Sequence, residues 1–220
     1  MPLARAKFLL KFGLASALGV LISACATAPP PKPSSSVVQP KVSARDQLFL
    51  DRQKRLKQID VWSFRGRAAV QRSAEGWSAT LHWQQNGSAY RLRIVAPLGQ
   101  GTYEILRDAE QVSLIDKDNQ VYHAQSPEAL VENAIGWKLP ISNIEYWIRG
   151  LTGPTEKPSQ LSLDEGGLIQ DLASGGWRVS ILEYQYIQGV AMPRKLFMNY
   201  GDTKIRVVIS KWDLDFNASQ

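Results

Sequence analysis

Hydrophobic residues alternate with polar ones over most of the 220-residue chain, which is the pattern of β-strands that bury one face. The first clear example runs over residues 62–70 and the second over residues 77–83. Asn86-Gly87 has the residue types of a hairpin turn, and Gly76 marks another expected turn. Further strands are expected around residues 90–94, 103–105, 112–114, 121, 161, 168–172, 177–182, 192–198 and 205–212. About ten or eleven strands are therefore predicted, in an antiparallel sheet with one face toward water.

Three segments have features of helices instead. Ser43 can cap a helix whose apolar side carries Phe49 and Leu56, and Ser126 can cap another that stops at Gly136. A short third helix is expected over residues 142–149. A mainly β chain with a few helices buries one face of a long meander most simply by curling it into a barrel or half-barrel closed by the helices.

The N-terminus has the features of a lipoprotein signal. Three basic residues precede an apolar stretch that ends at Ile22 and runs uninterrupted for only about ten residues, too short for a membrane-spanning helix. Ser23-Ala24 then precede Cys25, the only cysteine, in the pattern of a lipobox. Residues 1–24 are predicted to be a lipoprotein signal peptide and Cys25 the acylated N-terminus. The alternative is an ordinary secretory signal with a chance cysteine, although a lone thiol is a liability in an oxidising compartment.

The segment after the cysteine is predicted to be a tether. Residues 25–44 contain five prolines and a run of serines, and a proline-rich chain of about 19 residues reaches roughly 60 Å. Ala26 stands where aspartate tends to mark lipoproteins kept in the inner membrane of Gram-negative bacteria, so the outer membrane is the expected location. The remaining residues, 45–220, are expected to form one domain.

Charge and candidate chemistry give no sign of nucleic-acid binding or catalysis. The formal charge of +6 falls to +3 once the signal peptide and its three basic residues are set aside. The basic residues 52–57 are expected on a solvated helix face. His82 and His123 lie in different strands without a metal-binding spacing, and Asp116 and Asp118 fall in a turn where aspartate bonds to the backbone. We expect no enzyme activity, metal or cofactor.

Two apolar features of the sequence each have two possible interpretations. The early strands carry several tryptophans separated by alanines; a packed core is the simpler interpretation, and an open cavity is the alternative. The Pro97-Leu98-Gly99 segment lies between two strands, where polar residues are expected. Leu98 either folds inward or is exposed to meet an apolar partner.

Several separated motifs occur in order along the chain. They are Gly-Arg-Ala-Ala-Val at 66–70, Gly-Trp-Ser-Ala at 76–79, Trp-Gln-Gln at 83–85, Tyr-Arg-Leu at 90–92, Ala-Pro-Leu-Gly at 96–99, Gly136 with Leu139-Pro140, and Tyr-Trp-Ile-Arg-Gly at 146–150. Together with the lipobox and the tether they resemble the LolB family of outer-membrane lipoprotein receptors, across most of residues 45–212.

The resemblance implies a fold, a function and partners. The fold would be an antiparallel half-barrel, or incomplete β-barrel, with a helical lid enclosing an apolar cavity. The protein would receive triacylated lipoproteins from a LolA-type periplasmic carrier and insert them into the outer membrane without nucleotide hydrolysis. It would work as a lipid-anchored monomer on the periplasmic face of that membrane.

Particular residues are expected to carry these roles. Leu98 is the candidate for membrane insertion. The acyl-chain cavity candidates are Trp62, Phe64, Trp83, Leu92, Ile94, Trp147 and Ile148.

Two other hypotheses stay open on the sequence alone. A lipocalin-like lipoprotein that binds lipids or small ligands would have the same strands but no need for an apolar tip at Leu98. A structural outer-membrane lipoprotein would have a packed core and no cavity.

Overall fold

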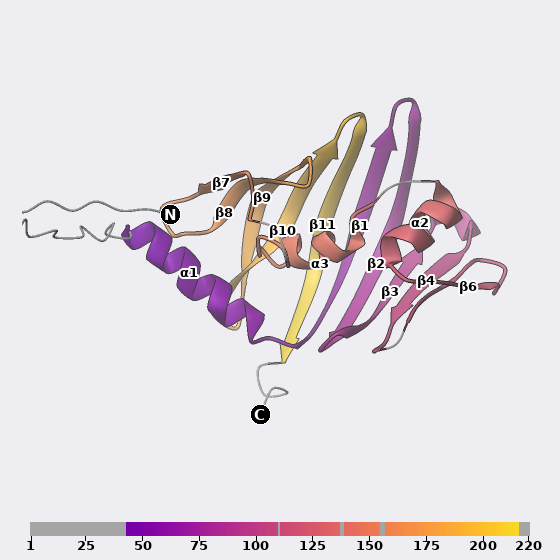
Figure 1. Cartoon of the computed structure of the whole chain (residues 1–220), viewed down its shortest axis with the longest axis horizontal. Coiled ribbons are helices and arrows are strands. Elements are labelled where there is room, and N and C mark those ends of the chain that lie inside the picture. Colours follow the sequence, from indigo (N-terminus) through magenta and orange to yellow (C-terminus); the bar gives the residue numbers. More distant parts are fainter. Residues whose placement is uncertain (1–42, 110, 137–138, 155–156, 216–220) are drawn as a thin grey trace, which may run out of the picture. The chain divides into compact units, whose positions relative to one another are not determined.

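The computed structural model describes residues 43–215 except residues 110, 137–138 and 155–156. Within these residues eleven strands form one antiparallel sheet in the order β6-β5-β4-β3-β2-β1-β11-β10-β9-β8-β7 (Figure 1). The strands are β1 Val61–Arg72, β2 Glu75–Asn86, β3 Ala89–Val95, β4 Thr102–Arg107, β5 Val112–Ile115, β6 Val121–Ala124, β7 Gln160–Leu163, β8 Ile169–Ser174, β9 Trp177–Ile187, β10 Val190–Tyr200 and β11 Thr203–Asp215. The predictions for residues 1–42, including the signal peptide and Cys25, lie outside the described residues.

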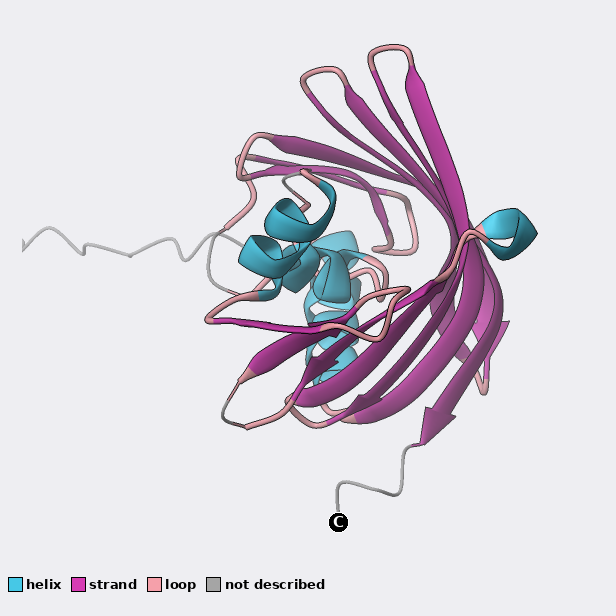
Figure 2. Cartoon of the chain, turned by 90° about the vertical axis from the view of Figure 1, so that its right-hand side faces the viewer, coloured by secondary structure: helices cyan, strands magenta, loops and turns pink. Residues whose placement is uncertain are grey.

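The sheet is an open half-barrel, as the resemblance implied. Its two edges are β6 and β7, whereas β1 and β11, from opposite ends of the described chain, pair in the middle. Figure 2 shows the sheet curving around the helices, so that it has a concave face under them and a convex face on the other side. No closed barrel forms, and nothing in this arrangement favours the lipocalin-like alternative.

Gly66 helps to bend the centre of the sheet. The register between β1 and β11 shifts between Arg65 and Gly66, which marks a β-bulge. A Cβ on Gly66 would lie 2.7 Å from the carbonyl oxygen of Val208, closer than real side chains approach backbone. Glycine therefore allows the two central strands to approach at the bulge, and a bulge strengthens the local bend and twist.

Three α-helices lie on the concave side (Figure 2). They are α1 Ala44–Lys57, α2 Pro127–Ile135 and α3 Ile141–Trp147. Ser43 and Ser126 cap α1 and α2 by accepting hydrogen bonds from the backbone N–H groups of Asp46 and Ala129. Gly136 ends α2 in the left-handed conformation, as predicted. In the described part of the chain no helix is both long and apolar enough to cross a membrane.

One predicted turn is wrong. The β1–β2 hairpin turns at Ser73 and Ala74, because Arg72 pairs with Glu75, and Gly76 lies inside β2. Ser73 has a positive φ of 51°, a conformation that glycine adopts more readily than serine. The turn predicted at Asn86-Gly87 lies one residue later, at Gly87 and Ser88, because Asn86 pairs with Ala89, and Gly87 has a φ of 58°.

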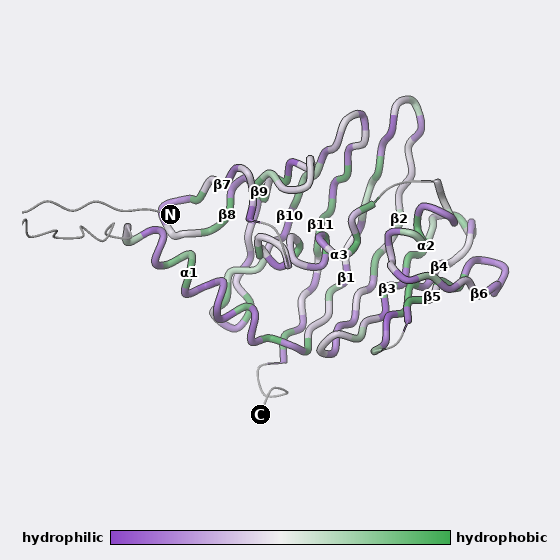
Figure 3. Tube along the Cα trace, viewed as in Figure 1, coloured by the Kyte–Doolittle hydropathy of each residue, from purple (hydrophilic) through white to green (hydrophobic). Residues whose placement is uncertain are grey.

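The apolar residues of the strands gather on the concave face. In β1 the exposed and buried positions alternate from Phe64 to Val70. Figure 3 shows hydrophobic and hydrophilic segments mixed along the central strands. The buried side chains of the sheet and of all three helices form one hydrophobic core. The helices are thus held by the same apolar surface that curls the sheet.

Candidate functional site

Aromatic rings from four neighbouring strands, β11, β1, β2 and β3, pack together on the concave face. Trp62 stacks on Trp83 with ring centroids 5.7 Å apart, and Phe64 lies 6.2 Å from Trp83. Trp212 of β11 reaches both Trp62, at 5.8 Å, and Phe64, at 5.3 Å. Tyr90 of β3 lies 5.0 Å from Trp83 on the other side. We call these five residues the aromatic cluster.

The structure brings the predicted cavity residues into one core, but packs them against their neighbours. Six of the seven are at most 4 % exposed, namely Trp62, Phe64, Trp83, Leu92, Trp147 and Ile148, and Ile94 is half-buried against them. A half-open recess of about 340 Å³ lies beside Trp62, with Lys57, Glu145 and Arg149 among the residues around it. The role of the seven predicted cavity residues as a lining for acyl chains stays a prediction. Such a lining would form only if the helices moved away from the sheet.

Sequence reasoning missed Trp212 and Tyr90 as members of this cluster. Trp212 is far from Trp62 in the chain and reaches it because Phe64 and Trp212 are partners in the β1–β11 register. Two polar atoms in the cluster, Trp62 Nε1 and the Tyr90 hydroxyl, are buried without a hydrogen-bond partner among the described residues. Burial raises the pKa of Tyr90, so its hydroxyl keeps its proton. Buried donors without partners are uncommon in proteins, so this cluster contains unused hydrogen-bonding capacity.

The end of α3 forms the cover predicted for this site. Trp147 is fully buried and lies against Trp177 of β9, with centroids 6.4 Å apart, rather than in ring contact with the aromatic cluster. Glu128 of α2 accepts a hydrogen bond of 2.7 Å from the Ser142 N–H of α3. The two short helices therefore sit on the concave face as one connected unit.

A buried arginine connects this cover to the aromatic cluster. The Arg149 guanidinium lies 5.1 Å from the ring of Trp62 and 5.4 Å from that of Tyr146. Glu145 is its nearest carboxylate, 3.9 Å away and also buried. Burial lowers the pKa of Arg149 and raises that of Glu145. The opposite charge of each side chain partly offsets the pKa shift of the other. Arg149 belongs to a motif of the resemblance, yet nothing in its spacing indicated this contact.

The first helix, α1, is hydrogen-bonded to the backbone that directly follows α3. Arg52 donates hydrogen bonds to the carbonyl oxygens of Gly150, Arg149 and Ala191, and Gln53 donates a further one of 2.9 Å to Gly150. Gly150 has a φ of 74°, and a Cβ on this residue would lie 3.1 Å from the guanidinium nitrogens of Arg52, which leaves little room for a side chain. The end of α3 is thus held by α1, which would have to shift or release it before the cover could open widely.

Leu98 is exposed on a tight turn. It belongs to the 3-10 helix η1 (Pro97–Gly99), and its side chain is 98 % exposed. The turn is closed by hydrogen bonds from the Ala96 N–H to the Gly101 carbonyl and from the Gln100 N–H to the Pro97 carbonyl. Leu98 has a φ of 54°, which is uncommon for a residue with a large side chain. The inward-folded alternative is therefore wrong.

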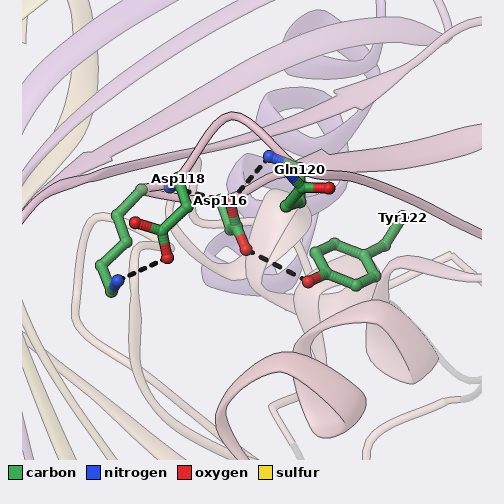
Figure 4. A network of polar contacts seen from close by, with 5 residues as sticks. Asp116, Asp118, Gln120 and Tyr122 are labelled. Atoms are coloured by element: carbon green, nitrogen blue, oxygen red, sulfur yellow. Dashed lines mark hydrogen bonds and ion pairs between the residues drawn. The ribbon is translucent and has the colours of Figure 1, made fainter.

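The remaining polar candidates lie on strand surfaces or in a turn. His82 points to the convex face from β2, and His123 is exposed in β6. Figure 4 shows Asp116 accepting hydrogen bonds from the backbone N–H groups of Asp118 and Gln120, both at 2.9 Å, and from the Tyr122 hydroxyl. The predicted turn role of Asp116 is confirmed. In the described part of the chain no group of three or more His, Cys, Asp or Glu side chains could hold a metal ion.

Comparison with known proteins decides the family. The family model described as outer membrane lipoprotein LolB matches residues 60–212. This chain belongs to the LolB family. The LolB protein of Nitrosococcus oceani is 32 % identical over 89 % of this chain and 93 % of its own length. The LolB protein of Alkalilimnicola ehrlichii is 34 % identical over 91 % of this chain and 96 % of its own length.

Solved structures support the fold independently. A LolA superfamily protein from Nitrosomonas europaea matches with a TM-score of 0.50 over 76 % of this chain and 93 % of its own, at 8 % identity. A domain of a putative outer membrane lipoprotein-sorting protein from Vibrio parahaemolyticus matches with a TM-score of 0.52 over 79 % of this chain and 97 % of its own, at 11 % identity. At such low identity these likenesses concern the fold alone.

Proposed function

We propose that the protein receives lipoproteins from a LolA-type periplasmic carrier and inserts them into the outer membrane. The observation that carries this proposal is Leu98, a large apolar side chain held almost fully exposed on a closed turn. A positive φ at a non-glycine residue costs on the order of 1 kcal/mol, and exposing leucine forgoes burial energy. The side chain is 98 % exposed, so packing within the described domain does not offset the lost burial energy, and we assign Leu98 an apolar partner outside the domain.

The concave face is the proposed place for the acyl chains of the cargo. It has a continuous apolar surface, and its helical cover is made of two short helices joined to each other. Trp62 Nε1 and the Tyr90 hydroxyl could donate to the ester or amide oxygens next to the acyl chains. Because the rings are packed together, binding requires α2 and α3 to move, and acyl chains would replace the contacts that the helices give up.

The transfer needs no covalent chemistry. Exposing tens of methylene groups to water costs tens of kcal/mol, at about 0.8 kcal/mol each, so acylated cargo does not cross the periplasm free. A receptor that binds acyl chains more tightly than the carrier and less tightly than the bilayer moves cargo downhill. We therefore assign the protein a transfer role and no enzymatic one.

Lipid anchoring completes the proposal. Acylation of Cys25 would fix the N-terminus in the outer membrane, on its periplasmic face, after removal of residues 1–24. The proline-rich segment 25–44 would act as a tether, with the folded domain following from residue 45. Such a tether raises the local concentration of the domain at its acceptor membrane. A monomer suffices for this role.

The test separates receipt of cargo from delivery. Carrier loaded with a radiolabelled lipoprotein is mixed with the mature chain, residues 25–220, carrying Cys25→Ala, and then with liposomes. Leu98→Glu should still receive cargo but fail to deliver it, because a charge at the tip opposes entry into the bilayer. Leu50→Glu, which also changes an exposed leucine but in α1, is the matched control and should do both.

Two outcomes would overturn the proposal. Delivery by Leu98→Glu at the normal rate would remove the role of the tip, and failure of the parent Cys25→Ala protein to receive cargo would remove the receptor function. Labelled palmitate appearing on the Cys25→Ala protein would contradict the anchor site.

A further inference from the structure

The convex face of the sheet carries a row of basic residues across its centre. Lys211, Arg65, His82, Arg93 and Glu104 are successive partners across β11, β1, β2, β3 and β4. All point away from the helices, because they alternate with buried residues of the same strands. Four of the five are basic, whereas alternating signs would be expected if this row served to stabilise the sheet.

The cations of this face are poorly neutralised. Arg93 pairs with Glu104 at 3.4 Å. Within the described residues no salt bridge involves Arg65, Arg67, Arg206 or Lys211, all of which are exposed. Burial and the nearby Arg65 and Arg93 lower the pKa of His82, which agrees with a positive potential at this face.

The exposed leucine projects from the same face. Figure 2 shows a short helix, η1, standing out from the convex side of the sheet, opposite the other helices. A groove of about 540 Å³ runs beside it, and its lining includes Pro97, Arg67, Arg206 and Val208. An adjoining groove continues along Arg206 to Lys204 and Phe197. An apolar tip and a basic surface thus lie side by side on residues distant in sequence.

We propose that this convex face binds anionic phospholipid headgroups while Leu98 enters the acyl layer. The proposal rests on the membrane role proposed for Leu98 and deepens it by naming the lipid class. Single apolar insertions give only weak membrane binding, and a cluster of basic residues is the usual second signal. Arg67 and Arg206, which share the groove with Pro97, are the residues placed to hold phosphate groups beside the inserted tip.

A membrane fits this surface better than a protein partner does. Stable protein interfaces have a central apolar anchor surrounded by further contacts that exclude water. Leu98 stands alone at the end of its turn, so a partner protein would need a pocket matched to one side chain. A fluid bilayer needs no such match, and its anionic headgroups complement the arginines.

Vesicle binding of the mature chain, residues 25–220, carrying Cys25→Ala tests this without carrier or cargo. Co-sedimentation is measured with phosphatidylethanolamine vesicles and with vesicles that also contain about 30 mol% phosphatidylglycerol. Binding should rise at least about tenfold with phosphatidylglycerol and fall as salt increases from about 0.05 to about 0.5 M. The double variant Arg67→Glu, Arg206→Glu should bind anionic vesicles at least about tenfold more weakly than the parent protein does.

Two pairs of variants control for folding and for charge. Arg67→Lys with Arg206→Lys keeps the charges and should retain most of the binding. Lys54→Glu with Lys57→Glu changes the net charge equally at exposed positions of α1, on the other side of the sheet, and should bind as the parent does. Equal binding to both vesicle types, or equal loss in this second control pair, would overturn the proposal.

A separate outcome distinguishes the receptor function from the lipid preference. If the Arg67→Glu, Arg206→Glu protein binds anionic vesicles normally but no longer takes cargo from the carrier, the face docks a protein and the lipid proposal is wrong. Normal transfer by the parent protein to vesicles without anionic lipid would leave the receptor function intact and likewise contradict the need for headgroup binding.

Discussion

The two faces of the sheet use apolar residues in opposite ways. On the concave face Trp62, Phe64 and Trp83 are almost completely buried and touch one another and the helices. On the convex face Leu98 is exposed, on a backbone conformation that leucine rarely adopts. Arg67 and Arg206 line the groove beside its turn and form no salt bridge within the described residues. The concave residues have a structural reason within the domain, whereas the convex ones have none.

This contrast makes stability and delivery separable. Substitutions under the helices should change the free energy of unfolding, with function changing as a consequence. Substitutions around η1 should change membrane delivery while the fold is kept. Variants on the concave face, at the junction of α1 and α3 and at η1 should therefore differ in which of the two properties they change.

Trp83→Ala should lower the free energy of unfolding by roughly 3–5 kcal/mol, because it removes a large side chain packed on three sides. It also removes the 2.8 Å hydrogen bond from Trp83 Nε1 to Gln85. Gln84→Ala, the next residue and exposed on the convex side, should change stability by at most about 0.5 kcal/mol. Urea denaturation measures both, and a loss well below this range would show that Trp83 borders open space instead.

Arg52→Met should cost about 2–3 kcal/mol, because hydrogen bonds from a charged donor to buried carbonyl oxygens are lost at the junction of α1 and α3. Lys54→Met, in the same helix but exposed, is the control and should be nearly neutral. Denaturation gives the values, and hydrogen exchange at residues 147–151 should show faster local opening in Arg52→Met. Unchanged exchange there would mean that α1 does not hold the cover.

Leu98→Asn should leave stability unchanged or raise it by up to about 1 kcal/mol, since asparagine tolerates a positive φ better than leucine. The same protein should deliver less cargo to liposomes. A stability loss above about 1 kcal/mol would place Leu98 among the structural residues and break the contrast between the faces.

Local patterns in the sequence were enough to predict most elements of the fold. Alternation located the strands because each has one buried face, and the Ser126 and Gly136 caps located α2. The turn predicted at Gly76 is wrong because the hairpin places Ser73 at a positive φ, where turn statistics favour glycine. Leu98 could be found because its residue type conflicts with the chemistry of a turn.

Long-range contacts could not be predicted in the same way. The ring contact between Trp62 and Trp212 depends on the pairing of β1 with β11. The hydrophobic pattern of one strand does not show which strand pairs with it. The position of Arg149 over Trp62 depends on how α3 lies on the sheet. The basic residues of the convex row cannot be recognised along the chain, because they come from four strands and meet only through the register.

The smallest expected effect is local and depends on pH. Desolvation alone would raise the pKa of Asp116, but hydrogen bonds from the backbone of Gln120 and Asp118 and from Tyr122 outweigh it and lower the pKa. The folded state therefore binds fewer protons here than the unfolded state, so this contribution is present above the unfolded pKa, near 3.9, and disappears as the pH falls through the lower folded pKa. The Asp118 and Gln120 amides should lose protection from hydrogen exchange over that range, once intrinsic rates are corrected. Asp116→Asn should show weaker protection at neutral pH and no such titration, and protection in the parent that does not vary with pH would contradict the role of the carboxylate.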